Sequence, residues 1–378
     1  MNIGIFGGSF DPPHLEHVRL AAAAVGSLNL DKLFVVPAHT PPHKKDKVLS
    51  SDENRLEMCR IAFNDCPRTE VSDCEIRQGG TSYTYLTCRR FRELYPAAKL
   101  FWLVGTDMLR DFPTWRNPEE ILSLASLAVC ARAEKPGWTE KELKDFTARF
   151  KTDFAIIRYD GKDVSSTEVR VLAAAGEDVI SLVGAKTAEY IRKNRLYEIP
   201  HAREALLLEK PSRRAHSIRV ALFAAEYAAK FGISEKQAVT AALFHDCAKN
   251  LPPDSPYLRG FRPPKGVPEP VLHQYSGAYV AEKFFEVTDG EVLDAIRYHT
   301  SGRADMTSLE KLVFLSDMLE SGRQFDGVEK LRKIFREEGL DSCMRHALKD
   351  TLSYLEKSGG EIYPLTREAY EFLKREQA

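Results

Sequence analysis

Short apolar runs alternate with helical patterns through the first 200 residues. Five runs are almost continuously apolar and rich in β-branched or aromatic residues, at residues 3–6, 33–36, 100–104, 127–131 and 154–157. Strands that helices cover on both faces show such runs, because neither face meets water. The pattern therefore predicts an α/β fold for this half, a doubly wound parallel sheet with crossover helices.

The strand-like runs stop after about residue 200. Residues 213–231 have a helical pattern, and the Ser-Glu-Lys-Gln sequence that begins at Ser234 matches a capping box and opens a helix expected to run to Lys249. A second capping-box match, Thr307-Ser-Leu-Glu310, opens another helix further on. The second half of the chain is therefore predicted to be all-α.

The length of the chain also points to two domains. A single hydrophobic core rarely organises 378 residues. Together with the change of pattern, this predicts a Rossmann-like domain over residues 1–198 and a helical domain over residues 199–378.

Charge and cysteine content exclude several classes of protein. The 54 basic and 55 acidic residues give a net charge of −1, so no basic field favours nucleic acid or a membrane surface. The seven cysteines are odd in number and scattered without a CxxC pair, which predicts reduced thiols. The sequence has no secretory signal pattern and no long apolar span. We expect a cytoplasmic protein; its oligomeric state is left open.

The turn after the first predicted strand carries the first group of candidate residues, Gly7-Gly8-Ser9-Phe10-Asp-Pro-Pro-His14-Leu-Glu-His17. In a doubly wound sheet, glycines at this turn let backbone amides approach a phosphate, and the next helix N-terminus favours negative charge. His14 and His17 are three residues apart, so both can face the same anion. The alternative is a tight turn with two solvated histidines.

Other motifs fall near predicted strand ends or helix starts, where ligands of α/β proteins bind. They are Pro41-Pro-His-Lys44-Lys, Ser82-Tyr-Thr84, Val104-Gly105-Thr-Asp107-Met with Trp115, and Val164-Ser-Ser166-Thr167-Glu-Val-Arg170. In this order and spacing, the set resembles the bacterial nicotinate-nucleotide adenylyltransferases, within the wider HxGH nucleotidylyltransferase superfamily. The resemblance covers about residues 1–198.

The resemblance implies a reaction without a covalent enzyme intermediate. The 5′-phosphate of nicotinic acid mononucleotide would attack the α-phosphorus of ATP in line, and pyrophosphate would leave. Catalysis would then consist of positioning and charge stabilisation, with Mg²⁺ on the triphosphate.

The resemblance also implies a role for each motif. His14 and His17 would hold the α- and β-phosphates, and Lys44 and Arg170 the triphosphate tail. Gly105 and Asp107 would meet the adenosine ribose, and Trp115 would stack on the pyridine ring with Thr84 nearby, although an isolated tryptophan of this kind is more often a core aromatic. The remaining expected substrate contacts are Gly7, Gly8, Ser9, Phe10, Ser166 and Thr167.

One position departs from the family pattern. Glu16 stands between the two histidines, where the family has glycine. A carboxylate there would repel a triphosphate unless its side chain points away. Because the other motifs of the family are present, we expect the Glu16 side chain to point to solvent.

The helical half carries a second group of candidate residues. Six imidazole and carboxylate side chains fall on predicted helices or at their ends: His216, His245, Asp246, His273, His299 and Asp317. A single buried histidine is more often a core residue than a ligand, but six such groups together favour a metal site. The ligand types suit Fe, Mn, Zn, Co or Ni, and the lack of thiolates argues against structural zinc. A binuclear centre, with Asp246 bridging two ions, fits best.

This second group lies in motifs that resemble the HD superfamily, specifically its symmetrical diadenosine tetraphosphate hydrolases. The motifs are Arg213-x-x-His216, His245-Asp-Cys-Ala-Lys249, His273, Ile296-Arg-Tyr-His299 and Leu315-Ser-Asp317-Met-Leu-Glu-Ser-Gly-Arg323. The resemblance implies cleavage of diadenosine tetraphosphate into two ADP, with iron favoured and manganese as the alternative, and with Lys249 at a substrate phosphate. Two alternatives stay open: a regulatory module that binds nucleotide or metal without turnover, and a phosphohydrolase with another substrate.

Overall fold

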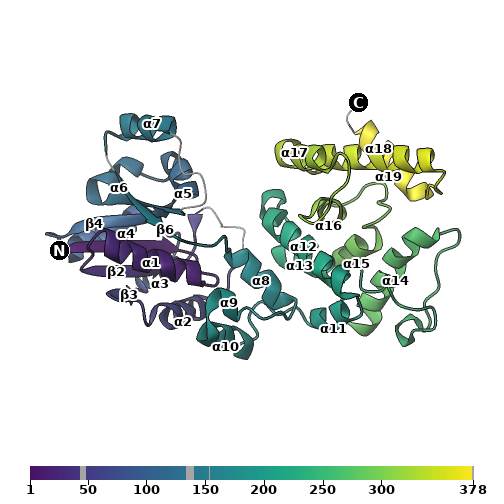
Figure 1. Ribbon diagram of the computed structural model, residues 1–378, viewed down its shortest axis with the longest axis horizontal. Helices are drawn as coiled ribbons and strands as arrows, with labels where there is room; N and C mark the ends of the chain where they lie inside the picture. The colour runs from purple at the N-terminus through teal and green to yellow at the C-terminus, as the bar shows by residue number, and fades with distance from the viewer. Residues whose placement is uncertain (43–47, 133–139, 153, 377–378) are drawn as a thin grey trace. The chain divides into compact units, whose positions relative to one another are not determined.

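The structure is a computed structural model that describes residues 1–42, 48–132, 140–152 and 154–376 (Figure 1). It divides into two compact units. The first unit comprises Met1–Val169 and Asp178–Leu196, and the second comprises Arg170–Glu177 and Tyr197–Ala378. The chain thus enters the second unit briefly, returns to the first, and leaves it after Leu196. A boundary at one point in the sequence does not capture this exchange.

The first unit is built on a parallel sheet of six strands in the order β3-β2-β1-β4-β5-β6. The predicted doubly wound fold is confirmed. The strands are β1 (Asn2–Gly8), β2 (Lys32–Pro37), β3 (Thr69–Val71), β4 (Lys99–Gly105), β5 (Ser126–Arg132) and β6 (Ala155–Tyr159). The sequence pattern missed only β3, because its three residues, Thr-Glu-Val, form no apolar run.

The strand order places the switch point of the sheet beside β1. The chain adds β2 and β3 on one side of β1, and then β4 to β6 on the other. Crossover connections therefore diverge at the carboxyl ends of β1 and β4, which is where ligands of open α/β sheets bind. The glycines Gly8 and Gly105 end these two strands.

Alternate residues of the central strands enter two apolar cores, one on each face of the sheet. Ile5 and Trp102 belong to one core, and Phe6 and Leu103 to the other. Strands covered on both faces need no polar alternation, which explains the continuous apolar runs. The helices of the first part of the chain are α1 (Leu15–Ser27), α2 (Asp52–Phe63), α3 (Cys74–Gln78), α4 (Thr84–Leu94), α5 (Thr106–Asp111), α6 (Pro118–Leu124), α7 (Glu140–Phe150), α8 (Ser166–Ala174), α9 (Ile180–Val183) and α10 (Ala185–Lys193).

Helices form the regular secondary structure of the described residues of the second unit, as predicted (Figure 1, teal to yellow). Its helices are α11 (Ala202–Leu207), α12 (Pro211–Ala228), α13 (Glu235–Phe244), α14 (Glu269–Phe284), α15 (Gly290–Arg297), α16 (Ser308–Leu319), α17 (Val328–Glu338), α18 (Leu340–Ser358) and α19 (Pro364–Arg375). They share one apolar core, to which Val171, Ala174 and Ala175 also contribute.

The end of α13 differs from the prediction. The expected continuation to Lys249 is wrong, because the helix ends at Phe244 and residues 245–250 form turns. The amides of Cys247 and Lys249 donate to the carbonyls of Phe244 and Asp246, three residues back, at 3.2 and 3.0 Å. Such tighter turns commonly finish a helix. His245 and Asp246 thus lie in the turn rather than on a regular helix.

The two predicted capping boxes have different outcomes. At α16, Thr307 Oγ1 accepts from the Glu310 amide at 3.2 Å, and Glu310 Oε2 accepts from the Thr307 amide at 2.7 Å. At α13, Ser234 Oγ accepts from the Gln237 amide, but the Gln237 side chain donates to Asp289 instead of returning to Ser234. Of these two boxes, the one at α16 is complete.

Two expectations from composition can be checked against the described residues. All seven cysteines are free thiols in buried positions, as their scattered placement predicted. Among the described residues, none of the helices combines the length and the apolar character needed to cross a membrane.

Candidate active sites

The two N-terminal histidines lie where the sequence predicted, at the start of α1. His14 is the residue before the helix, and His17 is one turn into it. Their rings stack with centroids 3.7 Å apart, and the His14 amide donates to His17 Nδ1 at 3.1 Å. Because Nδ1 of His17 accepts this bond, its Nε2 carries the proton and can donate to an anion.

Phe10 and the glycines before it shape this turn from within. Phe10 is 2% exposed and packs edge-on against the His17 ring, with centroids 5.1 Å apart. A side chain on Gly7 would come within 2.7 Å of the Trp102 ring, so the close packing of β1 on β4 requires glycine there. Any contact that Phe10 makes with a substrate must therefore use its backbone, because its side chain belongs to the core.

Two other motifs approach the carboxyl edge of the sheet. Ser166, at the start of α8, donates from Oγ to the Pro12 carbonyl at 2.9 Å, which brings α8 beside the histidine turn. The preceding Ser165 caps α8 by accepting from the Glu168 amide at 3.0 Å. Ser82 accepts from the backbone of His39, at the end of β2, at 2.9 Å. Ser165 thus caps α8, and Ser82 contacts the segment that follows β2.

The motifs proposed for the nucleoside ends lie at the start of α4, in α5 and in the segment after it. Thr84 begins α4, and Gly105 precedes α5 at the end of β4. Trp115 is 9% exposed and lies in the core with Phe112, as the core-aromatic alternative expects. Its stacking on a pyridine ring stays a prediction. Asp107 lies in α5, and its side chain is outside the described part of the structure.

The two cations expected at the triphosphate tail have different outcomes. Lys44 lies outside the described residues. Arg170 belongs to the second unit and is buried there, with Nε 2.6 Å from Glu235 Oε1 and its terminal nitrogen 3.0 Å from Oε2. This fork-to-fork pair is the arrangement in which arginine also binds phosphate. The role of Arg170 at a triphosphate, like that of Thr167 in α8, stays a prediction.

The expectation that Glu16 points to solvent is wrong. Its side chain is only 4% exposed. One carboxylate oxygen pairs with Arg19, and the other accepts from the Lys162 amide at 2.9 Å. The Glu16 carboxylate is therefore paired with groups of the first unit, which offset its negative charge.

This pairing leads to a prediction for Glu16→Gly. We expect KM for ATP to change by less than about twofold, while the free energy of unfolding of the first unit falls by about 1–3 kcal/mol because the Lys162 amide loses its acceptor. All three tryptophans lie within the first 138 residues, so tryptophan fluorescence during urea denaturation reports on this unit. Glu16→Gln, which keeps an acceptor oxygen, is the control. A several-fold lower KM for ATP in both variants would show that the carboxylate acts on the triphosphate.

The six candidate ligands of the second half converge from several helices. His216 lies in α12, His273 in α14 and Asp317 in α16, while His245 and Asp246 follow α13 and His299 follows α15. All but Asp317 are less than 9% exposed. The fold thus collects side chains that are up to 101 positions apart in sequence, from His216 to Asp317, into one cluster.

Asp246 lies at the centre of this cluster. Its Oδ1 is 3.3 Å from His273 Nε2 and 3.5 Å from His299 Nε2, while its Oδ2 is 3.5 Å from His245 Nε2. The two carboxylate oxygens therefore face different imidazoles. A carboxylate with this environment can bridge two cations.

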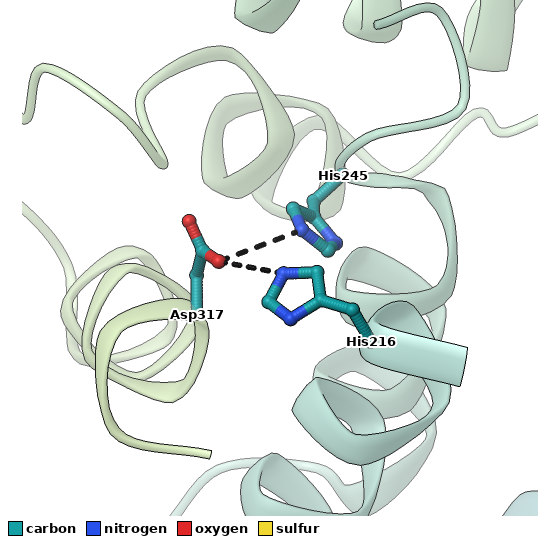
Figure 2. Close-up of side chains that lie close together, drawn as sticks. All are labelled: His216, His245 and Asp317. Carbon is teal, nitrogen blue, oxygen red and sulfur yellow. Dashed lines mark ion pairs between the residues drawn. The ribbon is translucent and has the colours of Figure 1, made fainter. Parts of the chain in front are cut away.

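Asp317 organises the other side of the cluster. Its Oδ1 lies 2.8 Å from His216 Nε2 and 4.0 Å from His245 Nε2, and Figure 2 shows the oxygen facing both imidazoles. The ligand atoms of His216, His245 and Asp317 form one group within 4.8 Å of one another, and those of His245, Asp246 and His299 form a second. His245 belongs to both groups, so the two candidate positions are adjacent.

The protonation states of most of these groups suit a cation. Burial opposes the charge on Asp246, but the His245 and His299 imidazoles outweigh burial and hold the pKa of Asp246 well below its usual range. Burial, with His299 nearby, lowers the pKa of His273 to about 2, and burial also lowers the pKa of His299. At neutral pH the carboxylate is therefore anionic and these two imidazoles are neutral, which are the metal-binding forms.

His245 gives a direct test of whether a cation fits. Its Nε2 is buried and has no hydrogen-bond partner among the described residues, although Asp246 and Asp317 oxygens lie 3.5 and 4.0 Å away. Burial lowers the pKa of His245, but the Asp246 carboxylate outweighs it and raises that pKa to about 9. Buried polar atoms are seldom left without a partner. A divalent cation between these groups would replace the proton on His245 and satisfy all three.

Other polar side chains also contact the ligand cluster, and Arg323, which pairs with Asp317, is one of them. Lys249 Nζ lies 3.2 Å from Asp246 Oδ1, and Arg213 pairs with Asp246 Oδ2. The role of Lys249 at a substrate phosphate stays a prediction. Glu320, which the sequence analysis did not select, accepts from His216 Nδ1 at 3.0 Å. Its position three residues after Asp317, on the same helical face, is the signal that could have identified it.

Comparisons with known proteins cover both halves of the chain. The cytidylyltransferase-like family matches residues 5–172, and the HD domain family matches residues 213–322. The chain is 36% identical over 197 residues to a probable nicotinate-nucleotide adenylyltransferase of Clostridium tetani, a match that covers 51% of this chain and 97% of the relative.

Two relatives match across both units. A probable nicotinate-nucleotide adenylyltransferase/Ap4A hydrolase of Mycoplasma pneumoniae is 30% identical over 324 residues, which cover 84% of this chain and 88% of the relative. The protein of the same description from Mycoplasma genitalium is 27% identical over 361 residues, covering 93% and 97%. The chain therefore belongs to the family of nicotinate-nucleotide adenylyltransferases that carry a C-terminal HD domain.

Proposed function

We propose that this protein is a bifunctional enzyme. The first unit transfers the adenylyl group of ATP to nicotinic acid mononucleotide, giving deamido-NAD and pyrophosphate. The second unit hydrolyses diadenosine tetraphosphate to two ADP. Family membership and the names of the mycoplasma relatives support both activities.

The histidine pair at the switch point supports adenylyl transfer. His14 and His17 stack at the N-terminus of α1, where the helix dipole and a protonated Nε2 favour phosphate oxygens. As the nucleotide phosphate forms its bond to the α-phosphorus, the bond to pyrophosphate breaks and negative charge grows on the phosphoryl oxygens. Fixed donors at that position stabilise the transition state more than the ground state. Mg²⁺ would accompany the ATP, with Lys44 and Arg170 at its tail.

The arrangement around Asp246 carries the proposal for hydrolysis. Asp246 faces His245 with one oxygen and His273 and His299 with the other, so it could bridge two ions, with His216 and Asp317 completing the ligand set. Bound cations would supply Lewis acidity and activate water for attack on phosphorus. Iron is the proposed metal, with manganese as the alternative.

Lys249 supports turnover rather than binding alone. Its ammonium lies beside the Asp246 carboxylate, and its side chain is 29% exposed, so it can contact the phosphate of a substrate that binds from solvent. An ammonium does not ligate a cation but offsets phosphate charge. A phosphate-binding cation beside candidate metal positions is the combination that phosphoryl hydrolysis needs.

Product analysis of the purified protein tests both activities. With ATP, Mg²⁺ and nicotinic acid mononucleotide, we expect equal amounts of pyrophosphate and deamido-NAD. With diadenosine tetraphosphate and Fe²⁺ or Mn²⁺, we expect two ADP per substrate. After treatment with a chelator and addition of Mg²⁺, we expect adenylyl transfer to proceed and hydrolysis of diadenosine tetraphosphate to stay lost.

Other products would contradict specific parts of the proposal. ATP plus AMP from diadenosine tetraphosphate would show asymmetric attack. Nucleotide binding without any cleavage would make the second unit a regulatory module. Cleavage of cyclic nucleotides or nucleoside triphosphates in preference to the dinucleotide would assign another substrate.

A further inference from the structure

We propose that Glu320 is a positioning residue of the metal centre, which holds His216 in the orientation and tautomer that a cation requires. Glu320 follows the last residue of α16 and its side chain is 1% exposed. It touches His216 at the nitrogen opposite the one that faces Asp317. This inference rests on the metal centre of the proposed function.

His216 lies between two carboxylates. Its Nδ1 is 3.0 Å from Glu320 Oε1, and its Nε2 is 2.8 Å from Asp317 Oδ1. A carboxylate at Nδ1 accepts the proton on that nitrogen, which leaves the Nε2 lone pair for a cation on the Asp317 side. A ligand histidine commonly donates its other nitrogen to such a partner, which fixes the ring and raises its basicity.

Glu320 cannot turn to become a ligand itself, because both of its oxygens are already held. Oε2 accepts from Arg219 Nε and from the Gly322 amide, each at 2.5 Å, and Oε1 also accepts from Arg219 at 3.3 Å. Arg332 fixes the turn that carries Glu320, by donating to the Leu319 carbonyl at 2.9 Å. The carboxylate is therefore locked toward His216.

Gly322 also contributes to holding Glu320 in place. A side chain on Gly322 would come within 2.6–2.8 Å of the Arg219 guanidinium. The absence of a side chain lets Arg219 lie against the turn and clamp Glu320. Because the guanidinium is the end of a flexible chain, an added methyl group would displace Arg219 while leaving the metal ligands untouched.

The test is Mn²⁺ affinity and stoichiometry, measured by calorimetry on the full chain. We expect Glu320→Ala to weaken binding of one ion by about 10–100-fold, as removal of an outer partner of a ligand does. Glu320→Gln should lower Mn²⁺ affinity less than Glu320→Ala does, since its carbonyl oxygen can still accept from Nδ1. Gly322→Ala should also lower Mn²⁺ affinity by a smaller factor, because it displaces Arg219. Excess Mn²⁺ should restore most diadenosine tetraphosphate hydrolysis to each variant.

A matched control separates positioning from general stability. Glu310 lies in α16, the helix that Glu320 follows, and is fully buried; its carboxylate pairs with Arg303 and the Thr307 amide rather than with a candidate ligand. Glu310→Gln should lower the denaturation temperature without changing Mn²⁺ affinity. Wild-type affinity in all three test variants would overturn the role of Glu320 alone. Absence of Mn²⁺ binding by the wild-type chain would instead overturn the metal centre, and the role of Glu320 with it.

Discussion

Asp246→Ala should abolish hydrolysis of diadenosine tetraphosphate while adenylyl transfer keeps its rate. We expect turnover to fall by more than about 10³-fold, beyond the 10–100-fold that an outer partner of a ligand contributes. The reason is that both oxygens of Asp246 face imidazoles of the cluster, so its removal takes a carboxylate ligand from both candidate ion positions at once. Elemental analysis measures the loss of bound metal, and product chromatography measures the loss of hydrolysis in the same preparation.

Lys249→Ala is the informative companion to this variant. It should retain the ions but lower hydrolysis, because the lost ammonium offsets phosphate charge rather than binding metal. Adenylyl transfer by the same preparations is the internal control, since its candidate residues lie in the first part of the chain. Hydrolysis by Asp246→Ala at the wild-type rate would remove this cluster from the mechanism. Fewer than about one ion per wild-type chain after reconstitution would contradict a binuclear centre.

His17→Ala should lower kcat for deamido-NAD synthesis by about 10² or more, the usual loss when one transition-state donor is removed. His17 Nδ1 accepts from the His14 amide, so its Nε2 is the donor. The effect should fall mainly on kcat, because the charge that His17 meets develops in the transition state. Steady-state kinetics with varied ATP measures both constants.

Two controls accompany His17→Ala. Tryptophan fluorescence during denaturation shows whether loss of the His14 cap or of the Phe10 contact unfolds the first unit. His201→Ala changes a half-buried histidine that takes no part in either candidate site and should leave kcat unchanged. Unchanged turnover in His17→Ala would exclude this histidine from catalysis.

The apolar runs and helical periods were enough to predict the fold class of each half. Burial on both faces leaves a direct trace in sequence, because most residues of a central strand are apolar. The three-residue strand β3 left no such trace, and α13 ended five residues earlier than its pattern suggested. Tight turns at Cys247 and Lys249 ended that helix, and such turns depend on the packing around them rather than on local preference.

The sequence also determined which residue types could form each site, because imidazole and carboxylate side chains are the groups that meet phosphates and metal ions. Only the tertiary structure decided their partners. It buried Glu16 against Arg19 and the Lys162 amide, placed Phe10 in the core, and paired Arg170 with Glu235. The physical reason is that a side chain's charge and orientation depend on neighbours that are distant in sequence. For Glu320 and His216 that separation is 104 residues, so neither motif by itself shows that the two side chains pair.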